Sequence, residues 1–270
     1  MAGLEQFAHV ARAAVDDASQ RLREAFGAPT PIEYKGAVDL VTAVDREVEA
    51  LVAGALHAAF PDHLVVGEEA SSGRPPARPR AGQYAWSLDP LDGTTNFAHR
   101  HPHFAVSLGL ALDGALLLGL VADPLRGELF AAVHGQGATL NGESIRVSHT
   151  AELDHALLAT GLPYDRREHP DRYLGVIRAF VLSAQGIRRA GSAALDLCYV
   201  AAGRADGFFE EILKPWDMHA GRLILEEAGG TVTRLDGTPL GLGPDGVVAT
   251  NGLIQDALVA ALREQKPALV

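Results

Sequence analysis

The segment at residues 86–97, with the sequence WSLDPLDGTTNF, constrains this chain most, because an apolar strand pattern runs directly into two closely spaced aspartates. Asp89 follows the predicted strand 84–88, and Pro90 biases it away from helical geometry. Asp92 comes three residues later, so both carboxylates can approach one point. Like charges this close repel unless a cation lies between them, and Mg²⁺ prefers oxygen ligands. The segment therefore predicts a divalent metal site at a sheet end, with capping of a turn and a helix as the alternative.

Further acids stand at the ends of other predicted elements. Glu68 follows the strand 64–67, and Asp39 and Asp45 bracket the start of a helix. Asp217 stands at another helix start, where capping explains it about equally well. The helix start at 94–96 offers free N–H groups that suit a phosphate, and Gly93 before it is expected to let a ligand approach the backbone. Together these positions favour a multi-metal phosphoryl-transfer site over unrelated caps.

The order of the predicted elements indicates helices first, then a mostly antiparallel sheet, then an α/β lobe. Helices are predicted at about 4–26, 42–59, 171–183, 193–202, 217–228 and 253–264. Strands are predicted at 64–67, 84–88, 104–112, 115–122, 128–133, 187–189, 206–210, near 232 and at 247–249. A loop is expected from Ala28 to about Asp39. We expect one compact structure made of an N-terminal part, 1–147, with most of the acids, and a C-terminal part, 148–270, with Asp217.

Charge and cysteine content exclude several classes of protein. The 34 acidic against 23 basic residues give a net charge of −11, which argues against nucleic acid as a partner. The longest apolar run, 111–122, is interrupted by Asp113 and is too short to span a bilayer. The first ten residues lack the pattern of a secretory signal. Cys198 is the single cysteine, which rules out an intrachain disulfide and fits the cytoplasm.

The motifs in combination resemble the inositol monophosphatase family of Mg²⁺-dependent, lithium-sensitive phosphatases over nearly the whole chain. The resemblance rests on the sequences DLVTAVD (39–45), GEE (67–69), DPLDGTTNF (89–97), GSAAL (191–195), PWD (215–217) and EAGG (227–230). It implies the layered α-β-α-β-α sandwich of the inositol monophosphatase and fructose-1,6-bisphosphatase type, usually assembled as a homodimer.

The resemblance also implies a ligand set for two to three Mg²⁺ ions per subunit. Metal ligands would be Glu68, Asp89, the carbonyl of Leu91, Asp92 and Asp217, with Asp45 at a weaker third site that Glu68 could share. The catalytic residues would be Asp89, together with Glu68 and Thr94, which would orient the attacking water. Substrate contacts would be Asp92, Gly93, Thr94, Gly191, Ser192, Ala193 and Glu210. The implied reaction is hydrolysis of a phosphate monoester by metal-activated water.

Several substrates and one different class of function remain open. Inositol 1-phosphate is favoured, with fructose 1,6-bisphosphate and histidinol phosphate as alternatives on the same site. Thr95 and Asn96 argue against the bisphosphate-nucleotidase branch, which commonly has Lys-Glu there. Some bacterial relatives also bind the transcription machinery, so a regulatory role is a second class. His219 stands where the family commonly has a small residue, and two helical steps from Asp217 turn it away from the metals. Lys35 is expected either to reach an outer metal or to be solvated.

Overall fold

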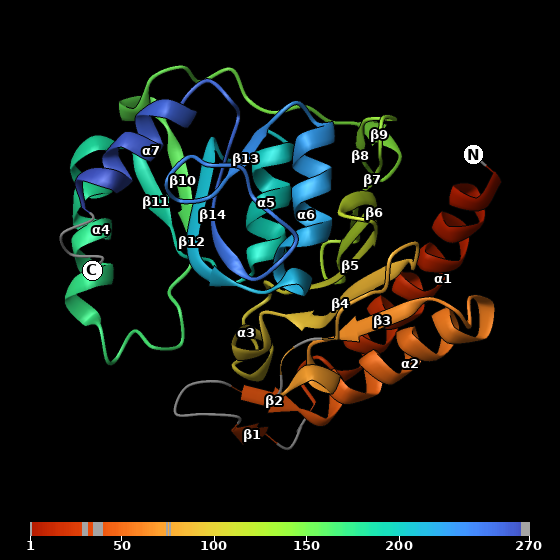
Figure 1. The fold of residues 1–270 in the computed structure, drawn as a ribbon. Helices are drawn as coiled ribbons and strands as arrows, with labels where there is room; N and C mark the ends of the chain where they lie inside the picture. Colours follow the sequence, from red (N-terminus) through yellow and green to blue (C-terminus); the bar gives the residue numbers. More distant parts are fainter. Residues whose placement is uncertain (1, 29–31, 35–39, 74, 76, 266–270) are drawn as a thin grey trace.

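The computed structural model of the chain describes residues 2–28, 32–34, 40–73, 75 and 77–265. The predictions for Lys35 and Asp39 lie outside these residues. Five layers follow one another across the molecule (Figure 1): a helix pair, a seven-stranded sheet, a second helix pair, a five-stranded sheet and an outer helix pair. This is the α-β-α-β-α sandwich expected from the sequence. No helix of the described part is long and apolar enough to cross a bilayer.

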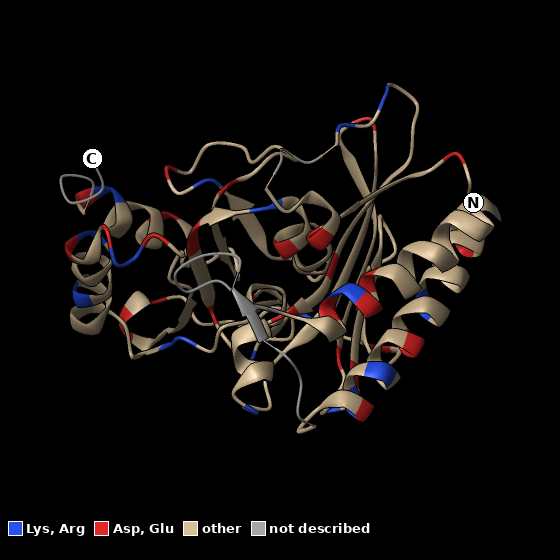
Figure 2. Ribbon diagram, turned by 90° about the horizontal axis from the view of Figure 1, so that it is seen from below, with Lys and Arg blue, Asp and Glu red and all other residues tan. Residues whose placement is uncertain are grey.

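The first layer consists of α1 (Ala2–Ala25) and α2 (Ala43–Ala59), close to the predicted bounds. In α2 the buried residues Val44, Val48, Val52 and Leu56 recur every four positions, which places them on one stripe of the helix. That stripe and its equivalent in α1 pack on the seven-stranded sheet in one hydrophobic cluster. Charged residues of both signs are carried along both helices (Figure 2), and Arg21 of α1 pairs with Glu47 of α2. The 3.6-residue period thus fixes which face is buried.

The seven-stranded sheet follows the chain in order, from β3 to β9. Its strands are β3 (Leu64–Gly67), β4 (Ala85–Asp92), β5 (Ala105–Leu112), β6 (Ala115–Asp123), β7 (Glu128–Val133), β8 (Ala138–Leu140) and β9 (Glu143–Ser144). Only the β3–β4 pair is parallel. Asp113 and Gly114, between β5 and β6, have φ of 46° and 87°, as a two-residue hairpin turn requires. The mostly antiparallel sheet predicted from the sequence is confirmed.

The five-stranded sheet mixes parallel and antiparallel pairs in the order β11-β10-β12-β14-β13. Its strands are β10 (Leu157–Thr160), β11 (Gly186–Arg188), β12 (Gly207–Leu213), β13 (Thr231–Thr233) and β14 (Asp245–Thr250). The helices α5 (Ala193–Ala201) and α6 (Pro215–Glu227) lie between the two sheets, whereas α4 (Pro170–Ser183) and α7 (Gln255–Glu264) cover the outer face (Figure 1). Because α5 and α6 belong to a core shared with the seven-stranded sheet, the division at residue 148 stays a prediction.

Five of the described strands were missed in the sequence: the short β8 and β9, and three more. β10 has a nearly continuous buried pattern, so it lacks the alternation that marks a half-buried strand. β1 (Ile32–Tyr34) and β2 (Leu40–Thr42) pair with each other, and β1 lies inside the stretch expected to be a loop. Strands of only three residues are too short for an alternating pattern to show, and β1 and β2 are recognised by their antiparallel pairing.

Helix α6 approaches the seven-stranded sheet closely at Gly119. A Cβ atom there would lie 2.6 Å from the carbonyl oxygen of Ala220, a backbone atom that cannot swing aside. We therefore expect Gly119→Ala to lower the free energy of unfolding by about 1–3 kcal/mol. Urea unfolding followed by circular dichroism measures it. Gly54→Ala is the control, because a Cβ on this exposed residue of α2 meets nothing and should slightly stabilise the helix. An unchanged midpoint for Gly119→Ala would show that α6 shifts without cost.

Candidate functional site

One cleft between the two sheets collects almost all of the predicted site residues. Its acidic lining residues are Glu68, Asp89, Asp92, Asp165, Asp196, Glu210 and Asp217, and its basic ones are Arg166, Arg189 and Lys214. The predicted residues that were expected to act through backbone or hydroxyl groups also line it: Leu91, Gly93, Thr94, Gly191, Ser192 and Ala193. The predicted residue that does not line the cleft is Asp45. Segments more than a hundred residues apart in sequence therefore meet at one acidic surface.

Strand β4 delivers the two aspartates of the opening motif to this cleft. The strand continues to Asp92 and does not end before Asp89 as expected. Its pairing with β5 shifts register between Asp89 and Asp92, around Pro90, which has no N–H to donate. Asp89 is buried, and its Oδ1 accepts a hydrogen bond of 2.9 Å from the backbone N–H of Leu91. The irregularity turns both carboxylates toward the same cleft.

The carboxylates perturb one another strongly. Burial, followed by the charges of Glu68, Asp92 and Asp217, holds the pKa of Asp89 well above its usual range. Burial and then Glu68 raise the pKa of Asp217 in the same way. Burial also raises the pKa of Asp92 to about 6, although hydrogen bonds from Ser192 and Ala194 oppose it. Several buried carboxylates are costly to ionise together, and a bound divalent cation would offset that cost by compensating their negative charge.

The donor set fits Mg²⁺ by its chemistry. It consists of carboxylate and carbonyl oxygens, which are the ligands that hard divalent cations prefer. Within the described part of the chain, no group of three His, Cys, Asp or Glu side chains lies close enough together to coordinate one metal ion. The residues thus supply suitable ligands around a cleft, and the exact ligation remains a prediction.

Glu68 is carried by a turn that a buried glutamate holds in place. β3 ends at Gly67, and the 3₁₀ turn η1 (Glu69–Ser71) follows Glu68. Glu49 of α2 accepts hydrogen bonds of 2.8 Å from the N–H groups of Glu69 and Ala70. A Cβ on Gly67 would fall 2.3 Å from Glu49 Oε2, so only glycine leaves room for this carboxylate. Sequence reasoning missed Glu49, whose role depends on a contact twenty residues away.

Asp45 and Thr94 form a second support. Asp45 Oδ2 accepts hydrogen bonds from the backbone N–H of Thr42 (2.8 Å) and from its hydroxyl (2.5 Å), a capping box at the start of α2. Asp45 Oδ1 lies 2.9 Å from Thr94 Oγ1, which is also 3.0 Å from the carbonyl oxygen of Leu91. Asp45 is fully buried, so a metal there would compete with these bonds. Its metal role remains a prediction.

The glycine after Asp92 has a different reason from the one expected. Gly93 has a φ of 101°, and a Cβ would meet the carbonyl oxygens of His103 (3.1 Å) and Gly191 (3.2 Å). Its missing side chain therefore makes room for protein, although the residue still lines the cleft. The short helix α3 (Thr94–Ala98) begins here, and Asn96 Nδ2 donates to His103 O at 2.7 Å and to Ala190 O at 2.9 Å. These contacts join α3 to the segment before α5.

The start of α5 meets Asp92 directly. Asp92 Oδ2 accepts hydrogen bonds from Ser192 Oγ (2.6 Å) and from the N–H of Ala194 (2.8 Å). Residues 191–193, predicted as substrate contacts, therefore share the cleft wall with a predicted metal ligand. Asp196, one turn further on, lines the same cleft, is buried, and has a pKa raised well above its usual range by burial and by Glu210. Sequence reasoning missed Asp196, although an acid inside the apolar run AALDLCYVA was a usable signal.

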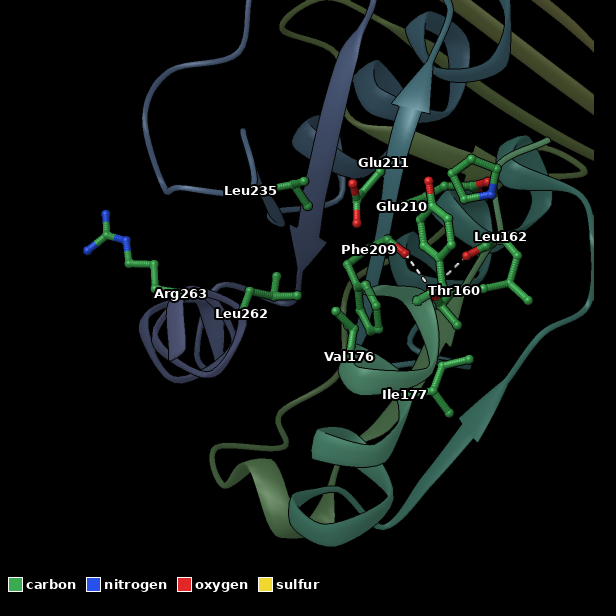
Figure 3. A pocket seen from close by; sticks show the side chains of 13 residues that line it. Thr160, Leu162, Val176, Ile177, Phe209, Glu210, Glu211, Leu235, Leu262 and Arg263 are labelled. Carbon is green, nitrogen blue, oxygen red and sulfur yellow. Dashed lines mark hydrogen bonds between the residues drawn. The ribbon is translucent and has the colours of Figure 1, made fainter. Parts of the chain in front are cut away.

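Glu210 lies on β12, which continues to Leu213 and does not end at Glu210 as expected. Burial and the charge of Asp92 raise the pKa of Glu210 to about 8, against the opposing effect of Arg189. Figure 3 shows Glu210 and Glu211 at consecutive positions beside a smaller pocket with mostly apolar walls. Glu210 lines both the cleft and this pocket, whereas Glu211 lines the pocket and pairs with Arg172.

His219 points away from the cleft, as predicted. It is buried, its Nδ1 lies 3.1 Å from Ser87 Oγ, and its Nε2 lies 3.1 Å from the carbonyl oxygen of Leu242. Burial lowers the pKa of His219 to about 4, so the ring is neutral at physiological pH. Cys198 is buried in the core, where it packs as a small apolar side chain.

Comparison with known proteins gives concordant results. The profile of the inositol monophosphatase family matches residues 3–267. The chain is 40% identical over 259 residues to Nus factor SuhB of Escherichia coli, covering 95% of this chain and 96% of that protein. It is 42% identical over 260 residues to inositol-1-monophosphatase of Synechocystis sp., covering 96% and 89%. The solved structure of inositol monophosphatase from Anabaena (Nostoc) sp. superposes with a TM-score of 0.84 at 41% identity, covering 97% of each chain.

Proposed function

The chain belongs to the inositol monophosphatase family and is a phosphatase, and from this premise we propose that it hydrolyses inositol 1-phosphate or a related polyol phosphate with Mg²⁺. The observation that carries the proposal is the acidic cleft, where burial and neighbouring carboxylates, Glu68 first among them, raise the pKa values of Asp89 and Asp217. An anionic substrate would be repelled by this surface alone. Once bound cations neutralise the carboxylates, the cleft can accept the phosphate group of a substrate.

Glu68, Asp89, the carbonyl of Leu91, Asp92 and Asp217 would hold two Mg²⁺ ions, and Asp45 would serve a third. Bound Mg²⁺ would supply Lewis-acid stabilisation of the phosphate and a water of lowered pKa. The protein's own groups would then align the reaction.

Thr94 is suited to orient the attacking water, because Asp45 and Leu91 O hold its hydroxyl from two sides. Glu68 would accept a hydrogen bond from the same water. The backbone groups of Gly93 and Thr94 would contact the phosphate, and burial in the cleft strengthens each of these interactions.

The substrate side of the cleft favours a group with several hydroxyls. The buried Asp196 and the half-buried Glu210 place two acids in the same cleft as Asp92, and residues 191–193 add backbone and hydroxyl groups. Carboxylates accept hydrogen bonds from vicinal hydroxyls, so a polyol is the best match. Inositol 1-phosphate is our first choice, and fructose 1,6-bisphosphate and histidinol phosphate are the alternatives.

Phosphate release from a substrate panel tests this function. Inositol 1-phosphate, fructose 1,6-bisphosphate, histidinol phosphate and 3′-phosphoadenosine 5′-phosphate would be assayed with Mg²⁺, with EDTA, and with Mg²⁺ plus Li⁺. We expect turnover only with Mg²⁺, inhibition by Li⁺, and the highest kcat/KM on inositol 1-phosphate. Absence of turnover on every substrate at saturating Mg²⁺ would refute the proposal, and a preference for another substrate would refute the polyol assignment.

Glu210→Ala tests the substrate side separately. Loss of the Glu210 carboxyl group leaves a polyol hydroxyl without its hydrogen-bond partner and should lower kcat/KM on inositol 1-phosphate by roughly 10–100-fold, with kcat/KM on p-nitrophenyl phosphate, which has no polyol, nearly unchanged. Glu211→Ala is the matched control, because this neighbouring acid does not line the cleft. Equal losses on both substrates would show that Glu210 supports the cleft and does not recognise the polyol.

A regulatory function is a second candidate, because one similar protein is named Nus factor SuhB. We propose that the chain binds the transcription machinery through a surface that is independent of the acidic site. Co-purification with RNA polymerase that persists in Asp89→Asn would support it, and absence of co-purification from the wild-type protein would exclude it.

We also propose a homodimer in the cytoplasm. The large apolar side chains that α4 exposes, Leu174, Val181 and Leu182, support self-association, and the single cysteine supports a reducing compartment. Light scattering coupled to size exclusion gives the mass directly, and a monomeric mass would contradict the dimer.

A further inference from the structure

His219 and Ser87 meet directly behind the two carboxylates that define the cleft. Ser87 precedes Asp89 by two residues on β4, and the two-residue period of a strand puts both side chains on one face. His219 follows Asp217 by two residues on α6. Both Ser87 and His219 are buried, and their hydrogen bond joins the element carrying Asp89 to the element carrying Asp217.

The direction of this hydrogen bond follows from the neighbours of the ring. The carbonyl oxygen of Leu242 can only accept, so His219 Nε2 carries the proton and donates to it at 3.1 Å. Nδ1 then has a free lone pair, and the Ser87 hydroxyl donates to it at 3.1 Å. The other acceptor near this hydroxyl, Gly109 O, is further away at 3.4 Å. Both ring nitrogens are therefore used, and the ring is fixed between helix, loop and strand.

Helix α6 packs closely against the sheet around this hydrogen bond. A Cβ on Gly109 would lie 3.0 Å from His219 Cβ and 3.0 Å from Ser87 Oγ, so helix and sheet touch here through the bare backbone of β5. A second hydroxyl group holds the start of α6: Ser107 Oγ of β5 donates a hydrogen bond of 3.0 Å to the carbonyl oxygen of Trp216, the residue before Asp217. Ser107 is also the residue of β5 that pairs with Asp89. The start of α6 is thus tied to the sheet on both sides of Asp217.

We propose that the His219–Ser87 hydrogen bond is a positioning device that fixes the separation of Asp89 and Asp217 for divalent-cation binding. The proposal rests on the proposed function, in which these two carboxylates share an ion. Their mutual repulsion in the metal-free protein favours a wider spacing. A rigid link between their backbones opposes this spreading, so the ligands are held ready and the ion need not draw them together.

The test is calorimetric titration of metal-free protein with Mg²⁺, without substrate. Ser87→Ala and His219→Ala should each weaken Mg²⁺ binding by about 10–100-fold, the usual cost of losing a group that orients a ligand. The double variant should be no weaker than His219→Ala, because both changes break the same bond. Ser87→Thr, which keeps the hydroxyl, should restore binding. At saturating Mg²⁺ the kcat of Ser87→Ala should stay within a few-fold of wild type.

Ser148→Ala is the control for a purely structural effect. It removes a hydroxyl that donates to Asp206, away from the cleft, and should lower stability with Mg²⁺ affinity unchanged. If Ser87→Ala lowers the unfolding midpoint but binds Mg²⁺ like wild type, the link only stabilises the fold and the proposal is wrong. Ser87→Ala decides the matter if His219→Ala does not fold. Wild-type protein that binds no Mg²⁺ would instead refute the proposed function.

Discussion

Asp89→Asn should lower phosphate release by about 10³-fold or more, even at saturating Mg²⁺, and should raise the thermal midpoint of the metal-free protein. The loss is expected because Asp89 is one of the proposed Mg²⁺ ligands, and metal-based stabilisation of the transition state depends on the bound ions. The gain in stability is expected because Asp89 is buried among Glu68, Asp92 and Asp217, so its ionised form is unfavourable without a cation.

The sign of the pH dependence follows from the raised pKa values. A carboxyl whose pKa is higher in the folded state binds more protons when folded, so metal-free protein gains stability as pH falls through that pKa. For Asp92 the gain begins near its folded pKa of about 6 and is complete below the ordinary value of 3.8. His103 and His219, whose pKa values burial lowers to about 4, act in the opposite sense below about 6.5. Both histidines are present in wild type and in Asp89→Asn, so the difference in thermal midpoint between the two proteins reports the effect of the carboxylates alone.

Differential scanning fluorimetry in EDTA at pH 7.5 and pH 5.5 measures both effects. Asp89→Asn should melt higher than wild type at pH 7.5, with a smaller difference at pH 5.5, and should respond less to added Mg²⁺. Asp17→Asn, an exposed acid of α1, serves as control and should leave midpoint and turnover unchanged. Near-normal turnover of Asp89→Asn with saturating Mg²⁺ would remove Asp89 from the catalytic site.

Thr94→Val should lower kcat by roughly 10²–10⁴-fold, the range typical for a positioned proton-handling group. Valine has nearly the shape of threonine but cannot orient a water. It also leaves Asp45 Oδ1 without its bond from the Thr94 hydroxyl, so stability should fall by about 1–3 kcal/mol.

The control for Thr94→Val is Thr94→Ser, which keeps the hydroxyl and should retain most of the activity. Steady-state phosphate release at saturating Mg²⁺ gives kcat for both variants, and urea unfolding gives their stability. A valine variant within tenfold of wild type would contradict the assignment. Equal losses in both variants would show that the hydroxyl alone does not account for the effect, and would contradict its assigned role.

The fold was predictable wherever a short stretch carries its own signal. The 3.6-residue stripe of α1 and α2 and the Asp-Gly turn at 113–114 identify their elements locally. β10 could not be identified in this way, because the sequence of a strand buried on both faces resembles any short apolar run. β1 and β2 exist through pairing with each other across a stretch rich in turn residues.

The same division applies to the cleft. Acids at element ends pointed to Glu68, Asp89 and Asp217, because position along an element is visible in sequence. Glu49 and Asp196 were missed, since their importance lies in being buried against segments distant in the chain. A capping box is a local pattern, but the bond from Asp45 to Thr94 spans 49 residues.

The position of α6 between the two sheets also bears on how the chain is made. The face of the seven-stranded sheet that holds Gly109 and Gly119 is covered by a helix that ends only at Glu227. A ribosome adding about 5–20 residues per second would finish β7 roughly 5–20 s before it finishes α6. During that interval the growing chain presents an uncovered apolar sheet face. We expect a truncated chain ending at residue 147 to be held by chaperones or to aggregate, and the full chain to be released once α6 has emerged.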